Sequence, residues 1–154
     1  MKPALEAAFL SLYDIIRAMK SVFEVADGLG VGRWAFQGQV TDEFFQQSFD
    51  ALSTVLEDVQ LNAGIIDFVD VTSFDVSENT LKQLASTHPI MPREMLRVVI
   101  APNSEVFAKA RLFAVLSELS RPNFFVVRSR EAAYHILGVT SPNFRPLRSV
   151  RSAS

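Results

Sequence analysis

The sequence predicts an α/β protein in which helices cover a mixed, mostly parallel sheet. From residue 64 onward, short apolar runs alternate with amphipathic stretches in the order strand, helix, strand, helix, strand, helix. This order favours a parallel sheet with right-handed crossovers. Residues 21–40 instead alternate with period two around the glycines of GLGVG, which predicts an antiparallel hairpin at the edge of the sheet.

Residues 1–20 are predicted to form a separate amphipathic helix. Its apolar residues recur at steps of three and four: Leu5, Phe9, Leu12, Ile16 and Met19. That spacing places them on one helical face. The face either packs on its own domain or binds a partner, and a homodimer through this helix is one prediction.

The first helix of the main domain is expected to begin at Thr41, which caps it, and to run to about residue 59. After it, residues 64–69 read as a short buried strand. The polar residues that follow predict a turn: Asp70, Thr72, Ser73 and Asp75. The next helix is expected to open near Ser77.

Two further strand–helix units complete the predicted domain, which spans residues 21–138. Residues 96–101 and 124–127 are apolar runs typical of buried strands. Asn103 and Ser129 are expected to cap the helices after them, and Gly138 to end the last one. Residues 139–154 contain two prolines and several arginines without an acid, which predicts a flexible tail or a short basic arm.

Composition excludes several classes of function. The 154 residues suffice for one domain with a real core. The formal charge of −2 provides no field that would attract nucleic acid, and the absence of cysteine excludes disulfides and thiolate zinc sites. No apolar run approaches the ~20 residues that a membrane span needs. With no recognisable signal peptide, a cytoplasmic location is predicted.

The sequence shows no catalytic constellation and predicts no cofactor. His88 and His135 are isolated, so an enzyme would require a cleft that gathers one of them with Asp67 and Asp75. Asp67 and Asp70 could also hold Mg²⁺ together with Asp75, because hard cations prefer oxygen ligands. The position of Asp67 within a strand run favours a turn-stabilising or capping role instead.

Ser77 is the candidate site residue with the clearest physical rationale. It occupies the N-cap or first turn of a predicted helix, where its simplest role is a cap that contributes ~1 kcal/mol. The alternative is a regulatory serine, because a phosphate there would meet free backbone N–H groups and the helix dipole. Asp75 and Glu78 would oppose that added charge.

The run IIDFVDVTSFDVSENTLKQLA resembles the signature segment of STAS domains, the anti-sigma-factor-antagonist (SpoIIAA-like) family. The match puts Asp67 on the strand aspartate, Asp75 on the turn aspartate and Ser77 on the serine presented to a kinase. Val76 and Glu78 stand where the family has serine and glycine. The later runs LRVVIAP, FAKARLFAVL and NFFVVRSREAAYHILG are similar to a divergent bacterial subgroup, so the resemblance covers residues 21–138.

The resemblance implies a SpoIIAA-like β-α superhelix and a non-catalytic module that binds a protein, such as a kinase or an anti-sigma-like partner, or a small ligand. We therefore expect a regulatory interaction module whose surface includes Asp70, Asp75, Ser77 and Glu78. The alternative is a carrier or sensor of a small apolar ligand. The phenylalanine content motivates it, in particular these residues: Phe107, Phe113, Phe124 and Phe125.

Overall fold

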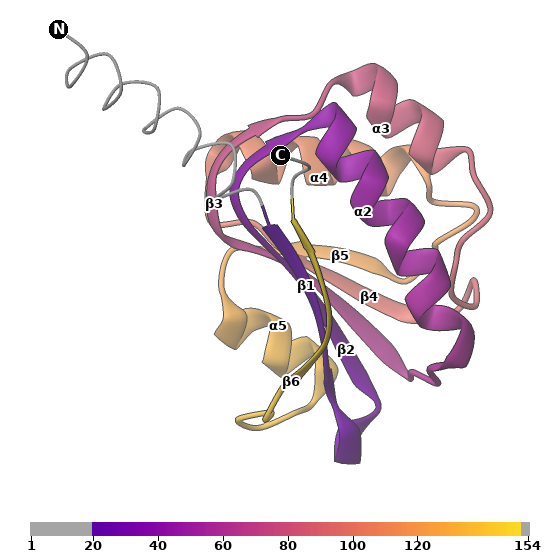
Figure 1. Cartoon of the computed structure of the whole chain (residues 1–154), viewed down its shortest axis with the longest axis vertical. Helices are drawn as coiled ribbons and strands as arrows, with labels where there is room; N and C mark the ends of the chain where they lie inside the picture. Colours follow the sequence, from indigo (N-terminus) through magenta and orange to yellow (C-terminus); the bar gives the residue numbers. More distant parts are fainter. Residues whose placement is uncertain (1–19, 152–154) are drawn as a thin grey trace, which may run out of the picture.

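The computed structural model describes residues 20–151, which form a mixed six-stranded sheet covered by helices (Figure 1). Strands β2 to β5 are parallel neighbours, whereas β1 is antiparallel to both β2 and β6. The predicted α/β fold and its mostly parallel sheet are confirmed. The order across the sheet is β5-β4-β3-β2-β1-β6. The strand bounds are β1 Lys20–Ala26, β2 Val31–Thr41, β3 Ala63–Asp75, β4 Leu96–Ile100, β5 Phe124–Val127 and β6 Arg145–Arg151.

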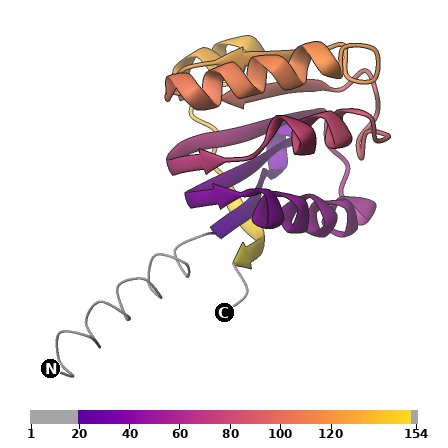
Figure 2. The ribbon, with the colours of Figure 1, turned by 90° about the horizontal axis from the view of Figure 1, so that it is seen from above.

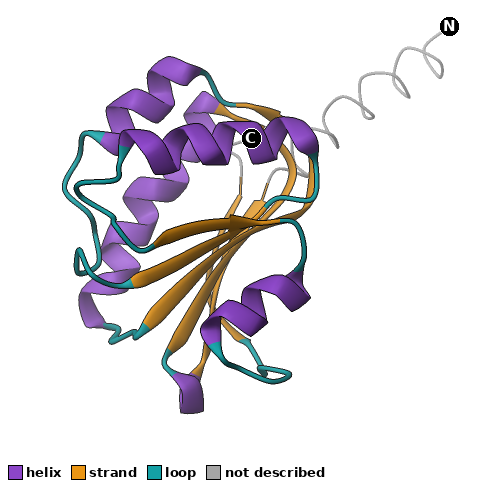
Figure 3. Ribbon diagram, turned by 180° about the vertical axis from the view of Figure 1, so that it is seen from behind, coloured by secondary structure: helices purple, strands orange, loops and turns teal. Residues whose placement is uncertain are grey.

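The helices lie on both faces of the sheet (Figures 2 and 3). Each connection from β2 to β5 steps toward the same edge, so crossovers of one hand put their helices on one face. The connection from β5 to β6 returns across the sheet, and the same hand puts its helix on the opposite face. The helices are α2 Asp42–Val55, α3 Glu78–Ala85 and α4 Ser104–Leu116 on the first face, and α5 Arg130–Leu137 on the second.

The glycine-rich segment forms the predicted hairpin. β1 and β2 pair in register from Lys20 opposite Gln37 to Ala26 opposite Val31. A single 3-10 turn at Asp27–Leu29 joins them, and Gly30 ends it with a φ of 65°, the left-handed region that favours glycine. No helix follows GLGVG directly, which agrees with a hairpin and not with a phosphate-binding loop.

Polar side chains begin the four helices as the sequence predicts. At each N-cap, a side-chain oxygen accepts a hydrogen bond from a backbone N–H of the first turn, and this satisfies a donor that the helix cannot. The acceptor–donor pairs are Thr41–Phe44, Ser77–Thr80, Asn103–Glu105 and Ser129–Ala132, at 3.2, 3.2, 2.8 and 3.1 Å.

The predicted turn at residues 70–75 is wrong, because β3 continues through it to Asp75. Strand β2 runs alongside as far as Thr41, which pairs with Asp75, so the backbone of this polar stretch has a partner. Two register shifts, one of them at Gly38 with a φ of 81°, accommodate the length. The alternation of polar and partly buried residues is that of a half-buried strand.

The predicted flexible tail is also wrong for residues 145–151, which form β6 on the outer side of β1. Without β6, the backbone groups on that side of β1 would be an open sheet edge. Pro146 is tolerated because β6 is itself the edge strand. Arg145 extends the contact: its Nη2 lies 3.0 Å from Oδ1 of Asp27. The helix predicted for residues 1–20, and the homodimer through it, lie outside the described residues except for Lys20.

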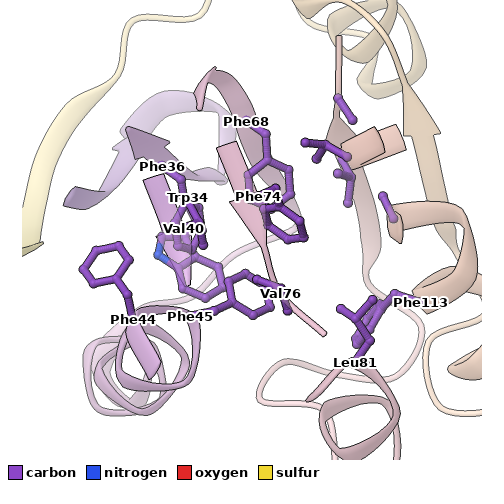
Figure 4. Packing of buried hydrophobic residues seen from close by; sticks show 14 of the residues in the cluster. Trp34, Phe36, Val40, Phe44, Phe45, Phe68, Phe74, Val76, Leu81 and Phe113 are labelled. Atoms are coloured by element: carbon purple, nitrogen blue, oxygen red, sulfur yellow. The ribbon is translucent and has the colours of Figure 1, made fainter. Parts of the chain in front are cut away.

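Each face of the sheet carries its own apolar cluster. Under α2, α3 and α4, an aromatic group packs at centroid distances of 4.6–6.4 Å (Figure 4). Its members are Trp34, Phe36, Phe45, Phe68 and Phe74. The cluster under α5 is smaller and aliphatic, and includes Ile65, Val98 and Ile100. Within residues 20–151, no helix is long and apolar enough to cross a bilayer.

Candidate functional site

Asp75, Ser77 and Glu78 lie where β3 ends and α3 begins, and all three are exposed. Two hydrogen bonds tie this corner to the end of β2 and the start of α2. Nε2 of Gln39 donates to Oδ2 of Asp75 at 2.9 Å, and the backbone N–H of Ser77 donates to Oδ1 of Asp42 at 2.7 Å. The corner is therefore a polar surface with a well-held backbone.

The electrostatics of this corner are acidic. The hydrogen bond from the Ser77 backbone stabilises the Asp42 carboxylate and lowers the pKa of Asp42 below its usual value. This N–H is thus already occupied by an anion. A phosphate on Ser77 would compete with Asp42 and stand beside Asp75 and Glu78.

Asp70 lies apart from the other three predicted site residues. It precedes Asp75 by five strand positions, about 16 Å along β3. Its Oδ2 lies 3.9 Å from Nη2 of Arg130 on α5, on the opposite face of the sheet from α3. The structure therefore brings Asp75, Ser77 and Glu78 together and leaves Asp70 in a different environment.

Asp67 is buried within a charged network beneath α5. Its side chain is 2% exposed, and its Oδ2 accepts a hydrogen bond from Nε of Arg130 at 3.0 Å. Arg33 lies 4.0 Å from the same oxygen, and the backbone N–H of Val69 donates to Oδ1 at 2.9 Å. Arginine partners oppose cation binding here, and the described residues contain no group of three side chains suited to a metal. The Mg²⁺ alternative has no support from this geometry.

Both histidines are exposed, and neither joins Asp67 or Asp75. His88 lies in the loop after α3 and His135 in the last turn of α5. Among the described residues, the structure therefore does not gather a histidine with Asp67 and Asp75, as the enzyme alternative requires.

The sequence did not locate a cavity of about 120 Å³ that lies between the sheet and α2, α3 and α4. Its lining includes Trp34 of β2 and Phe45 of α2, together with side chains of α3 and α4: Leu81, Ala110 and Phe113. In Figure 4, Leu81 and Phe113 stand apart from the ring cluster that surrounds Phe45. The phenylalanine content was the only signal for an apolar ligand, and of the four residues singled out, two line this cavity: Phe113 and Phe124.

Every charged side chain in the cavity lining is a cation: Arg97, Lys109 and Arg121. Lys109 is paired with Glu105 at 3.5 Å and donates to the Phe74 carbonyl at 3.0 Å. Arg97 and Arg121 are 8% and 4% exposed. Burial, and then the charge of Arg121, lower the pKa of Arg97 to about 10, and burial also lowers the pKa of Arg121. The cavity is thus apolar with a positive potential.

Comparison of the chain with protein-family models, curated proteins and solved structures found no match. The resemblance to STAS domains therefore stays a prediction.

Proposed function

We propose that the protein is a non-catalytic binding module that holds a small apolar ligand in the cavity beneath α2, α3 and α4. The observation that carries this proposal is an apolar cavity of about 120 Å³ between the sheet and three helices. An engineered apolar cavity of about 150 Å³ is large enough to bind benzene. The ligand is accordingly of that size, or is the inner end of a short acyl or aryl chain.

The energetic cost of such a cavity supports a binding role. Packed interiors contain few voids larger than a water molecule. Because the cavity is partly open to solvent, the cost of leaving it empty lies below the value for an enclosed void of this volume, which at about 24 cal/mol per Å³ is about 3 kcal/mol. This upper limit is a large fraction of the 5–15 kcal/mol that typical domains have. A ligand that fills the cavity recovers this free energy.

The chain contains one tryptophan, Trp34, and that residue lines the cavity, so its emission reports occupancy. We expect toluene and 1-hexanol to shift this emission and to raise the thermal midpoint of the wild type. Ala110→Leu, which extends an α4 side chain into the cavity, should abolish both effects. Ala108→Leu is the matched control, because Ala108 is exposed on the same helix. A wild type that responds to neither probe would contradict the proposal.

A second candidate function is protein binding through the corner of Asp75, Ser77 and Glu78. The observation that favours it is the exposure of all three residues, with the Ser77 backbone held by Asp42 and the Asp75 side chain held by Gln39. The resemblance to STAS domains points to kinase or anti-sigma-like partners. Titration of such candidate domains against wild type and Ser77→Asp tests this function, and equal affinities would remove Ser77 from the mechanism. A cytoplasmic location remains the expectation for either function.

A further inference from the structure

Arg121 is a largely buried cation with two hydrogen-bond donor atoms that have no protein acceptor, although neither atom is fully closed off from solvent. The residue follows α4 in the chain, and its side chain lies at the C-terminal end of α3, where Nη1 donates to the Ala85 carbonyl at 3.5 Å. Nη1 also donates to Oγ of the neighbouring Ser120 at 3.1 Å. The guanidinium carbon lies 5.3 Å from the ring centre of Phe113. Among residues 20–147, whose side chains the structure describes, Nε and Nη2 of Arg121 have no hydrogen-bond acceptor, and no carboxylate forms an ion pair with Arg121.

The second buried arginine, Arg97, increases this positive potential and has its own polar partners. Nη1 and Nη2 of Arg97 donate to four backbone carbonyls of the loop before β4, at 3.0–3.3 Å. These contacts hold the loop but bring no negative charge. Arg97 therefore uses both terminal nitrogens to hold the loop, whereas in Arg121 the adjacent pair Nε and Nη2 has no acceptor among the described residues.

Nε and Nη2 form the edge of a guanidinium that matches a carboxylate. Two other arginines of this protein use that edge. Nε and Nη2 of Arg33 both donate to Glu24, at 3.0 and 2.8 Å, and the same atoms of Arg145 donate to Asp27. In Arg121 the equivalent edge belongs to a side chain that lines an apolar cavity.

We propose that the cavity binds a small apolar carboxylate, with its hydrocarbon part among the apolar side chains and its carboxylate paired with Nε and Nη2 of Arg121. This inference rests on the proposed function and names its ligand class. A largely buried charge without a counter-ion is costly, and a bound carboxylate would take the place of solvent at Nε and Nη2 and supply the missing counter-ion. The charge also gives selectivity, because a neutral molecule of equal size leaves the cation unpaired.

The test compares hexanoate with 1-hexanol at pH 7, using Trp34 emission and isothermal titration calorimetry. The two probes share a six-carbon chain and differ in the anionic group. For the wild type we expect hexanoate to bind about 10- to 100-fold more tightly, the range that a charge-assisted hydrogen-bonded pair provides. Arg121→Met should remove this preference and leave the affinity for 1-hexanol within about twofold.

Arg128→Met is the matched control. Arg128 also stacks on a phenylalanine, with its guanidinium carbon 4.1 Å from the ring centre of Phe107, but it is exposed and does not line the cavity. The preference for hexanoate should persist in this variant. If Arg121→Met does not fold, Arg121→Lys replaces it: lysine keeps the charge but lacks the two-donor edge, so hexanoate affinity should fall while binding of 1-hexanol persists.

The outcomes separate the two proposals. If 1-hexanol binds to the wild type and hexanoate binds equally or more weakly, the carboxylate inference is overturned and the apolar cavity remains a binding site. If neither probe binds, the proposed function fails as well. A preference for hexanoate that survives loss of the Arg121 guanidinium would also overturn the assignment to this residue.

Discussion

Oδ2 of Asp67 in β3 accepts a hydrogen bond of 3.0 Å from Nε of Arg130 in α5, 63 residues further along the chain. This contact links the middle of the sheet to the helix on its second face. The burial of the two partners differs, with 2% of the Asp67 side chain exposed but 40% of the Arg130 side chain. The consequences of removing either partner should differ accordingly.

Arg130→Met should lower the free energy of unfolding by about 3 kcal/mol, because the buried carboxylate keeps the Val69 N–H but has only Arg33, at 4.0 Å, as a neighbouring cation. Asp67→Asn should cost about 1 kcal/mol, since water reaches the half-exposed guanidinium and the amide oxygen can still accept from Val69. Chemical denaturation of the two variants and the double variant measures both effects and their coupling. The reverse order would contradict this account of the network, and Arg128→Met controls for loss of an arginine.

Asp42→Asn should destabilise the protein in a pH-dependent way. The hydrogen bond from the Ser77 backbone lowers the pKa of Asp42 from its ordinary value of 3.8. A carboxyl group with a lowered pKa in the folded state contributes stability that is fully present above pH 3.8. That stability is lost as the pH falls through the pKa of the folded state. At pH 7 the variant should be less stable by about 0.5 kcal/mol, because the carboxylate is only partly buried and solvent screens it. Denaturation at pH 7 and at about pH 2 tests this prediction. The free energies of unfolding of the wild type and of Asp42→Asn should converge at low pH, and an equal difference at both pH values would contradict it.

Truncation after Phe144 should expose the outer side of β1. Since β6 pairs with β1 along residues 20–25, its removal leaves backbone groups open to solvent. Hydrogen exchange should show faster exchange of β1 amides, whereas Val98–Ile100 in β4 should stay protected. Arg145→Gln should change exchange little, because it keeps the strand and removes only an exposed ion pair. Unchanged β1 protection in the truncated protein would refute the pairing.

Ser77→Ala should destabilise the protein by about 1 kcal/mol through loss of the α3 cap. Ser77→Asp retains an acceptor for the Thr80 N–H but places a carboxylate beside Asp42, so its stability should rise with salt. Asn79→Ala, an exposed change in the first turn of α3, is the control. Thermal unfolding at low and high ionic strength distinguishes the cases. A thermal midpoint of Ser77→Asp that does not change with salt would show that the carboxylates of this corner do not repel one another measurably.

The features that the sequence predicted correctly depend on local patterns. The caps Thr41, Ser77, Asn103 and Ser129 act within one helical turn, and the glycine turn at residues 28–32 acts between two adjacent strands. The strand–helix alternation from residue 64 likewise reflects periodicity in short windows. Each of these needs only neighbouring residues, so each can be inferred without knowing the three-dimensional arrangement.

The features that the sequence missed depend on partners distant in the chain. The stretch from Asp70 to Asp75 has the composition of a turn, and it is a strand because β2 continues beside it. Residues 145–151 become a strand only because β1 offers a free side. Arg121 has the sequence context of a turn, and its burial against Phe113 and the α3 terminus follows from helix packing. No local pattern marks such a cation as part of a cavity.

The pairing of β1 with β6 places Lys20 opposite Arg151, so the two ends of the described domain are adjacent. Paired antiparallel residues lie about 5 Å apart at their Cα atoms, a gap that a very short peptide can bridge. The domain therefore has the geometry required for circular permutation, with new termini opened at the exposed residues 86–88 after α3. For the same reason, the domain could be inserted into a surface loop of a host protein without separating the two ends of that loop.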